Sequence, residues 1–206
     1  MPKPETVLKG YVKTENVILL LVVALALGFI GGVIFSVYRT SRTALPEGSS
    51  APQMTSQQKE TVENLIARTQ KNPQDVAAWT QLGHIYFDTN QPALAIDAYE
   101  RSLQLDADRP DVWTDLGVMY RRVGNPQKAI ECFDRALAQN PNHEVAQYNK
   151  GIVLMHDLKD AAGALSAWEK LVIIHPDAKT PAGEPLRNII EQLKQNIQTQ
   201  QKGPRN

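Results

Sequence analysis

The 206-residue sequence lacks several features that point to particular classes of protein. Its single cysteine, Cys132, excludes an internal disulfide framework and a zinc or iron–sulfur site built from several cysteines. Lys and Arg number 22 and Asp and Glu also 22, so no excess of positive charge favours nucleic-acid binding. The four histidines show no pair at metal-binding helical spacing, and the sequence has no glycine-rich phosphate loop. We therefore expect no enzyme activity, cofactor or metal.

Long apolar runs are also missing, with one exception near the N-terminus. Residues 17–37 read VILLLVVALALGFIGGVIFSV, 21 residues without a charged side chain. A helix of that length extends about 32 Å, which matches the hydrocarbon core of a bilayer. A cleaved signal peptide is the alternative, but its apolar region would be only about 7–15 residues long. We predict a transmembrane helix over residues 17–38 that contacts the lipid bilayer, after an N-terminal flank of residues 1–16.

Two features of this segment bear on its surroundings. Three lysines precede it and two arginines follow it, and this small excess of basic residues favours a cytoplasmic N-terminus. The rest of the chain would then lie in the periplasm, if the membrane is a bacterial inner membrane. Small residues at every fourth position share one helix face and would let two such helices form a homodimer, although such stripes are common in membrane helices. They are Ala24, Gly28, Gly32 and Ser36.

The chain beyond the apolar run repeats itself. Residues 39–55 have the Ser, Thr, Pro and Gly content of a flexible linker. After it, the segment Trp79-Thr-Gln-Leu-Gly-His-Ile-Tyr86 returns 34 residues later as Trp113-Thr-Asp-Leu-Gly-Val-Met-Tyr120. The shorter pattern Ala95-Ile-Asp-Ala-Tyr99 returns at the same offset as Ala129-Ile-Glu-Cys-Phe133. A fixed period of this length indicates a stack of similar units, each made of two helices.

Turn-forming residues divide each unit in two. Asn90 and Gly124 stand where the first helix should end, and both residue types tolerate the left-handed conformation of a helix stop. Pro92 and Pro126 follow two residues later, at a position that suits the first turn of a helix. The spacing therefore predicts a helix, a short turn and a second helix in each unit.

A third unit follows the pattern less well. It has Gln147 and Lys150 where the earlier units have tryptophan and leucine, and one extra residue between Leu154 and Ala164. We expect this unit to pack differently, and we expect an amphipathic helix over residues 185–198 to cap the stack. The predicted repeat domain covers residues 56–198, with units at 76–109, 110–143 and 144–178 and a disordered tail at 199–206.

These spacings resemble the tetratricopeptide repeat (TPR), in which W-x-x-L-G-x-x-Y is followed by A-x-x-x-F and a helix-ending proline. The resemblance implies an all-α fold, in which the transmembrane helix predicted above is followed by a TPR α-solenoid of about three helix pairs with a C-terminal capping helix. It also implies a protein-binding function. The residues that carry the pattern are Trp79, Leu82, Gly83, Tyr86, Ala95, Tyr99, Trp113, Leu116, Gly117, Tyr120, Ala129, Phe133, Ala136, Pro141, Gly151, Ala164, Trp168 and Pro176.

The order of parts is also similar to the bacterial cytochrome c biogenesis factors of the CcmH/CcmI/NrfG group. The apolar run comes first, then Asn72-Pro73-Gln74-Asp75, and later Ala167-Trp168-Glu169-Lys170-Leu171. In that group the domain faces the periplasm and holds unfolded apocytochrome c for haem attachment. The resemblance implies a membrane-anchored module that holds or presents a client polypeptide during assembly of an envelope complex. A self-assembling structural scaffold at the membrane is the alternative.

Stacked helix pairs present a concave surface lined by the first helix of each unit. There, Arg121 and Arg122 would border an apolar patch, so a bound segment should carry apolar anchors beside an acidic group or terminal carboxylate. Alternatively, both arginines pair with acids such as Asp88 or Asp115, or the capping helix covers part of the surface. The residues expected in this peptide groove are Thr80, His84, Phe87, Val118, Arg121, Arg122, Tyr148, Ile152 and Met155.

Overall fold

The structure is a computed structural model that describes residues 54–202. Within this range the regular structure is helical, apart from one isolated bridge between Lys179 and Pro185. The predicted all-α solenoid is therefore confirmed for this part of the chain. Its helices are α2 (Ser56–Lys71), α3 (Val76–Asp88), α4 (Pro92–Leu105), α5 (Pro110–Arg122), α6 (Pro126–Gln139), α7 (Glu144–His156), α8 (Ala161–Ile174) and α9 (Leu186–Lys202).

The predicted transmembrane helix at 17–38 and its contact residues Ala24, Gly28, Gly32 and Ser36 lie outside the described residues, as do the flank and nearly all of the linker. Among the helices from α2 to α9, none has the length and apolarity needed to cross a membrane.

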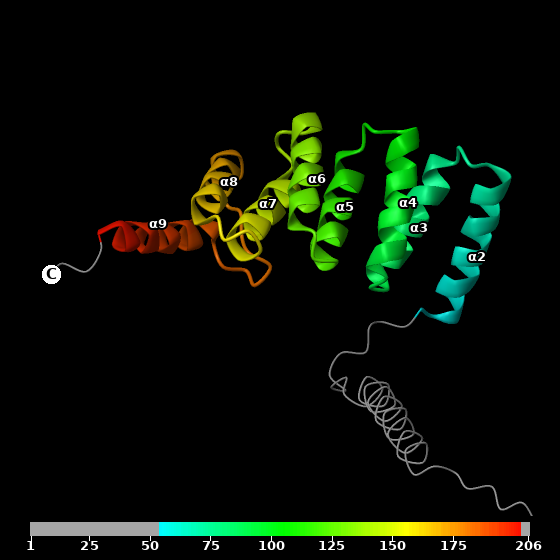
Figure 1. The fold of residues 1–206 in the computed structure, drawn as a ribbon, viewed down its shortest axis with the longest axis horizontal. Coiled ribbons are helices and arrows are strands. Elements are labelled where there is room, and N and C mark those ends of the chain that lie inside the picture. Colours follow the sequence, from blue (N-terminus) through cyan, green and yellow to red (C-terminus); the bar gives the residue numbers. More distant parts are fainter. Residues whose placement is uncertain (1–53, 203–206) are drawn as a thin grey trace, which may run out of the picture. The chain divides into compact units, whose positions relative to one another are not determined.

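The described helices stack in the order of the sequence, as Figure 1 shows from α2 to α9. From α2 to α9, helices that follow one another in the sequence pack together, and α3 pairs with α4, α5 with α6, and α7 with α8. The first helices of the pairs also contact one another, α3 with α5 and α5 with α7, whereas direct packing between α4 and α6 or between α6 and α8 is missing among the described helices. The first helices therefore form the inner side of the stack.

The helix stops follow the sequence prediction. Asn90 has a φ of 53° and Gly124 a φ of 76°, so both adopt the left-handed conformation expected after α3 and α5. Pro92 and Pro126 begin α4 and α6. In the third unit the equivalent turn is one residue longer, and Lys159, with a φ of 59°, takes the left-handed position there. Lysine has no special tolerance for that conformation, so the sequence did not point to it.

Close approach of the paired helices explains the repeated glycines. A Cβ atom at Gly117 would lie 2.6 Å from the ring of Phe133, and one at Gly83 would lie 2.3 Å from the ring of Tyr99. Both distances are far below van der Waals contact, so only glycine lets the two helices of a unit approach this closely. The aromatic ring opposite each glycine is completely buried.

The hydrophobic core is divided along the stack. One cluster joins α2, α3 and α4, and a second runs from α4 through α5 and α6 to Ala146 and Val153 of α7. A third cluster joins α8 to α9 and includes Trp168 and Leu186. Most of the repeat residues are buried, but Trp79, Tyr86 and Trp113 are half-buried, and Pro141 and Pro176 are exposed.

The C-terminal helix is longer than predicted. We expected the capping helix to end at residue 198 and a disordered tail to begin at 199, but α9 continues to Lys202. Ile197 still packs against the α8 and α9 cluster, and the Thr199 hydroxyl donates to the carbonyl oxygen of Gln195. Residues 203–206 of the predicted tail lie outside the described range.

Candidate peptide groove

The predicted groove residues fall on the inner helices, and all but one are at least partly accessible. His84 and Arg122 are exposed, whereas Phe87, Val118 and Arg121 are half-buried. The three predicted residues of α7, which are Tyr148, Ile152 and Met155, are also half-buried.

Thr80 is the exception and corrects the prediction. Its side chain is buried, and its hydroxyl lies 2.7 Å from that of Ser102 on α4 while donating to the carbonyl oxygen of Val76. Thr80 therefore faces the partner helix of its own unit and not a ligand. Thr114, one repeat later, is buried in the same way, 3.4 Å from Nε2 of His143. A hydroxyl carries no local signal for such long-range pairing, so sequence reasoning placed Thr80 on the wrong side.

The two arginines have different surroundings. Arg121 Nε lies 2.5 Å from a carboxylate oxygen of Asp157, at the end of α7. The guanidinium of Arg122 lies over the ring of Phe87, 4.6 Å from its centroid, and Nη1 donates to the Phe87 carbonyl oxygen at 3.2 Å. Arg121 is thus neutralised by an acid that the sequence analysis did not name. Among the described residues, Arg122 has no carboxylate within ion-pair distance.

One acidic residue lies in this region, Asp115. The sequence analysis considered it only as a partner for the two arginines. Asp115 on α5 lies 3.6 Å from Nε2 of His84 and accepts a hydrogen bond of 3.4 Å from the hydroxyl of Tyr99. Burial raises the pKa of Asp115 above its ordinary value, an effect that the charges of Asp111 and Asp88 reinforce and that His84 and Tyr99 oppose. Asp115 is therefore occupied by His84, and not by either arginine. Elsewhere along residues 54–202, no group of three or more acidic, histidine or cysteine side chains could hold a metal.

The α7 residues belong to a separate part of the inner side. Tyr148 stacks on Trp168, with ring centroids 6.4 Å apart, and both Ile152 and Met155 pack against the cluster that α8 and α9 form. Met155 also lines a cavity of about 300 Å³ together with Leu193 of α9. The capping helix thus takes up part of the apolar surface that was predicted for a ligand. The predicted groove residues that lie away from this cluster are on α3 and α5, among them Phe87, Val118 and Arg122.

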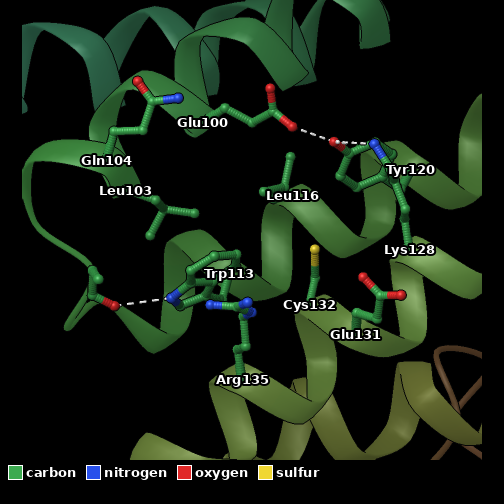
Figure 2. Close-up of a pocket in the computed structure, with 11 residues that line it drawn as sticks. Glu100, Leu103, Gln104, Trp113, Leu116, Tyr120, Lys128, Glu131, Cys132 and Arg135 are labelled. Carbon is green, nitrogen blue, oxygen red and sulfur yellow. Dashed lines mark hydrogen bonds between the residues drawn. The ribbon is translucent and has the colours of Figure 1, made fainter.

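The outer side of the stack, formed by α4, α6 and α8, carries a cavity that the sequence analysis did not predict. We call this cavity the α4–α6 slot. It is lined by residues of α4 and α6 and of α5 between them, and its volume is about 410 Å³. Figure 2 shows Leu103, Trp113 and Leu116 at its base and charged side chains around them. Cys132 lines it too, and burial raises the pKa of its thiol to about 12, so the thiol stays protonated at neutral pH.

The charged rim of the α4–α6 slot is largely engaged within the protein. Glu100 accepts a hydrogen bond from the hydroxyl of Tyr120. The ammonium group of Lys128 in turn donates to the Tyr120 hydroxyl oxygen at 3.4 Å, as Figure 2 shows. The guanidinium of Arg135 lies 4.9 Å from the centroid of the Trp113 ring system. Glu131 also lines the slot and is exposed, and within residues 54–202 it has no cation at ion-pair distance.

Comparison with known proteins bears on the fold. Residues 82–148 match the model of a family described as tetratricopeptide repeat. No curated protein matches the chain. Among solved structures, the crystal structure of MamA is 26% identical to this chain, with a TM-score of 0.55. The match covers 56% of this chain and 67% of the MamA chain, which is about two thirds of the MamA length.

Two further structures share this architecture at lower identity. A tetratricopeptide repeat protein from Parabacteroides merdae is 22% identical, with a TM-score of 0.58 over 68% of this chain and 54% of its own. The first TPR of Spaghetti (RPAP3), bound to the HSP90 peptide SRMEEVD, is 20% identical, with a TM-score of 0.53 over 60% of this chain and 94% of its own.

Proposed function

Because residues 82–148 match the tetratricopeptide repeat, we propose that the chain is a protein-interaction module whose α3 and α5 groove binds a segment of another protein. The bound segment would present apolar side chains to Phe87 and Val118 and a carboxylate to Arg122. Arginine offers planar paired donors that suit a carboxylate, and the apolar side chains offer surface that a ligand can bury.

The observation that carries this proposal is the environment of Arg122. Its Nη1 atom is held by the Phe87 carbonyl oxygen and lies 3.5 Å from Oδ1 of Asn90, so the guanidinium is fixed in position. A fixed arginine loses less conformational freedom when a ligand binds than a free one does. Its charge is uncompensated by any ion pair within the described residues, so a ligand carboxylate would supply the missing partner.

The first test measures binding to a defined peptide. The labelled peptide SRMEEVD combines acidic side chains with methionine and valine, and fluorescence anisotropy on the full chain gives its Kd. We expect Arg122→Gln to weaken binding about tenfold or more and to flatten its dependence on salt, since a charged hydrogen bond contributes about 1.5–3 kcal/mol. Arg121→Gln is the matched control, because Arg121 is already paired with Asp157. Equal effects of the two substitutions, or none, would refute the assignment of Arg122.

A second test addresses the native client. A photo-crosslinking amino acid at Val118 should capture a partner in cells, whereas one at Gln127, exposed on α6, should not. Capture of the same partner from both positions would contradict binding in the groove. Crosslinks only between copies of this chain would favour a self-assembling scaffold.

We also propose that residues 17–38 anchor the module in a membrane, where it holds or presents a client during assembly of an envelope complex, possible clients including c-type apocytochromes. The uncharged 21-residue run and the lysines before it support this proposal. An alkaline phosphatase fusion after Gln53 should be active if the repeats lie in the periplasm. An inactive fusion, together with an active cytoplasmic reporter at the same site, would reverse the orientation.

A further inference from the structure

The outer side of the stack carries a second slot, between α6 and α8. Two cavities of about 470 and 320 Å³ share Gln147, Lys150 and Lys170 as lining residues. Because they share these three residues, they form one continuous depression along both helices, which we call the α6–α8 slot. The inner helix α7 packs on both α6 and α8 and forms its base.

Apolar side chains line both ends of the α6–α8 slot. Ile130 and Leu154 lie at one end, and Leu137, Ile173 and Ile174 at the other. Ile173 is 77% exposed and Ile174 is 40% exposed. Isolated exposed apolar side chains are common, whereas adjacent ones at the edge of a cavity offer apolar surface that a bound molecule can bury.

The middle of the α6–α8 slot is positively charged. Lys150 pairs with Asp134, whose carboxylate is half exposed. Lys170 is exposed and lines both cavities, and within residues 54–202 it has no carboxylate at ion-pair distance. Two lysines and one aspartate leave a net positive charge between the two apolar ends. A complementary ligand therefore carries an acidic group between two apolar groups.

We propose that the α6–α8 slot docks an amphipathic helix of a partner protein, with an acidic residue facing Lys170 and apolar residues one turn away on either side. A helix places side chains at i, i+3 or i+4, and i+7 on one face, which matches an apolar, acidic and apolar order. The ridges of two neighbouring helices form a groove that accepts a third helix.

This docking site is separate from the α3 and α5 groove and does not depend on it. It also differs from the α4–α6 slot one repeat earlier, because there Ala138 stands in place of Ile173 and Arg135 in place of Lys170. There, the cation lies over Trp113. The exposed isoleucines and the open lysine are thus specific to the third unit.

The test uses two stapled helical peptides of about four turns, which carry leucine at i and i+7 and either glutamate or lysine at i+3 and i+4. Anisotropy titrations on the full chain compare the wild type with Lys170→Glu, Ile173→Asp and, as a control with the same charge change, Lys71→Glu on α2. All three side chains are accessible, so the substitutions should leave helical content unchanged by circular dichroism.

We expect the wild type to prefer the glutamate peptide about tenfold and Lys170→Glu to reverse that preference, a change of about 1.4 kcal/mol in each direction. Ile173→Asp should weaken both peptides, and Lys71→Glu should weaken neither. Equal affinity for the two peptides, or no response to Lys170→Glu, would overturn the proposal. Two other results of Ile173→Asp, with peptide binding unaltered, would also overturn it. Dissociation of an oligomer of the chain would mean that a second copy occupies the slot. Weaker binding to anionic vesicles would mean that a lipid surface does.

Discussion

The second and third repeat units share one architecture but fill it with different side chains. In the second unit, Trp113 and Leu116 face the α4–α6 slot, and the ring of Phe133 fills the space opposite a glycine. In the third unit Gln147 and Lys150 take the first two positions. The Gln147 amide donates to the carbonyl oxygen of Ala167 on α8, a buried hydrogen bond of 2.9 Å.

The difference shows where the third unit finds its stability. Trp168 is larger than Phe133, and it packs over Gly151 and joins Leu186 and Ile190 of α9 in one cluster. The core of the second unit extends to α4 of the first unit and to Ala146 and Val153 of α7, whereas α8 of the third unit shares its core with the capping helix. Because α9 takes up part of the inner apolar surface beside α7, the exposed isoleucines of the third unit, Ile173 and Ile174, lie on its outer side.

Removal of the central aromatic ring from each unit gives the largest expected effect. Phe133→Ala and Trp168→Ala should each cost about 3–5 kcal/mol, because both side chains are almost completely buried. In a stack, each unit contacts only its neighbours, so the loss should be local as well as large.

Amide hydrogen exchange on the two variants would separate the two cores. Trp168→Ala should increase exchange mainly in α7, α8 and α9, whereas Phe133→Ala should increase it throughout α4 to α7. Exchange that rises equally along the whole stack in both variants would contradict the division of the core.

Transfer of a third-unit residue into the second unit has a smaller effect. Trp113→Gln should cost about 2 kcal/mol, roughly half the value for a fully buried tryptophan, because Trp113 is only half-buried. Its indole also donates to the carbonyl oxygen of Ala107, which Gln139 can still satisfy. Urea denaturation gives the value, and a cost above about 4 kcal/mol would place Trp113 in the core.

The parts of the fold that the sequence predicted are those that depend on neighbouring residues. The left-handed turns at Asn90 and Gly124 and the prolines that begin α4 and α6 follow from the conformational preferences of single residues. The glycine and aromatic pairs follow from the repeat, which shows them twice at the same spacing. These features could be predicted because each carries its signal within one unit.

The parts that the sequence did not predict depend on side-chain contacts between helices, within a unit or between units. The partner of Arg121 is Asp157, 36 residues away at the C-cap of α7. Neither the buried pair of Thr80 and Ser102 nor the α6–α8 slot beside Ile173 has a local pattern. Side-chain pairing across a stack becomes visible only when the helices are placed in space.

Transfer of a second-unit residue into the third unit tests whether Lys150 serves binding or stability. Lys150→Leu restores the residue of the second unit, and we expect it to raise the free energy of unfolding by about 0.5–1 kcal/mol, because apolar burial outweighs the loss of a partly exposed ion pair. The same substitution should weaken binding of the glutamate peptide. Thermal unfolding and anisotropy measure the two effects, and a loss of stability would show that the pair with Asp134 is structural.

The smallest expected effect on stability concerns Asp115. The third unit has Asn149 at the equivalent position, so Asp115→Asn makes the second and third units alike there. The pKa of Asp115 is raised in the folded protein, chiefly by burial. The folded state therefore holds this proton more tightly than the unfolded state does. The resulting stabilisation is present below the unfolded pKa of about 3.9 and is lost as the pH rises through the folded value.

The Asp115→Asn variant loses this dependence, so its free energy of unfolding minus that of the wild type should increase between about pH 4 and pH 7. The increase should stay below about 1 kcal/mol, because the Asp115 side chain is 34% exposed and solvent screens its charge. The asparagine can still accept the hydrogen bond from Tyr99, so the rest of the site is preserved. Urea denaturation at several pH values measures the difference, with the exposed Asp97→Asn as control. A difference that falls as the pH rises would mean that His84 stabilises the carboxylate more than burial penalises it.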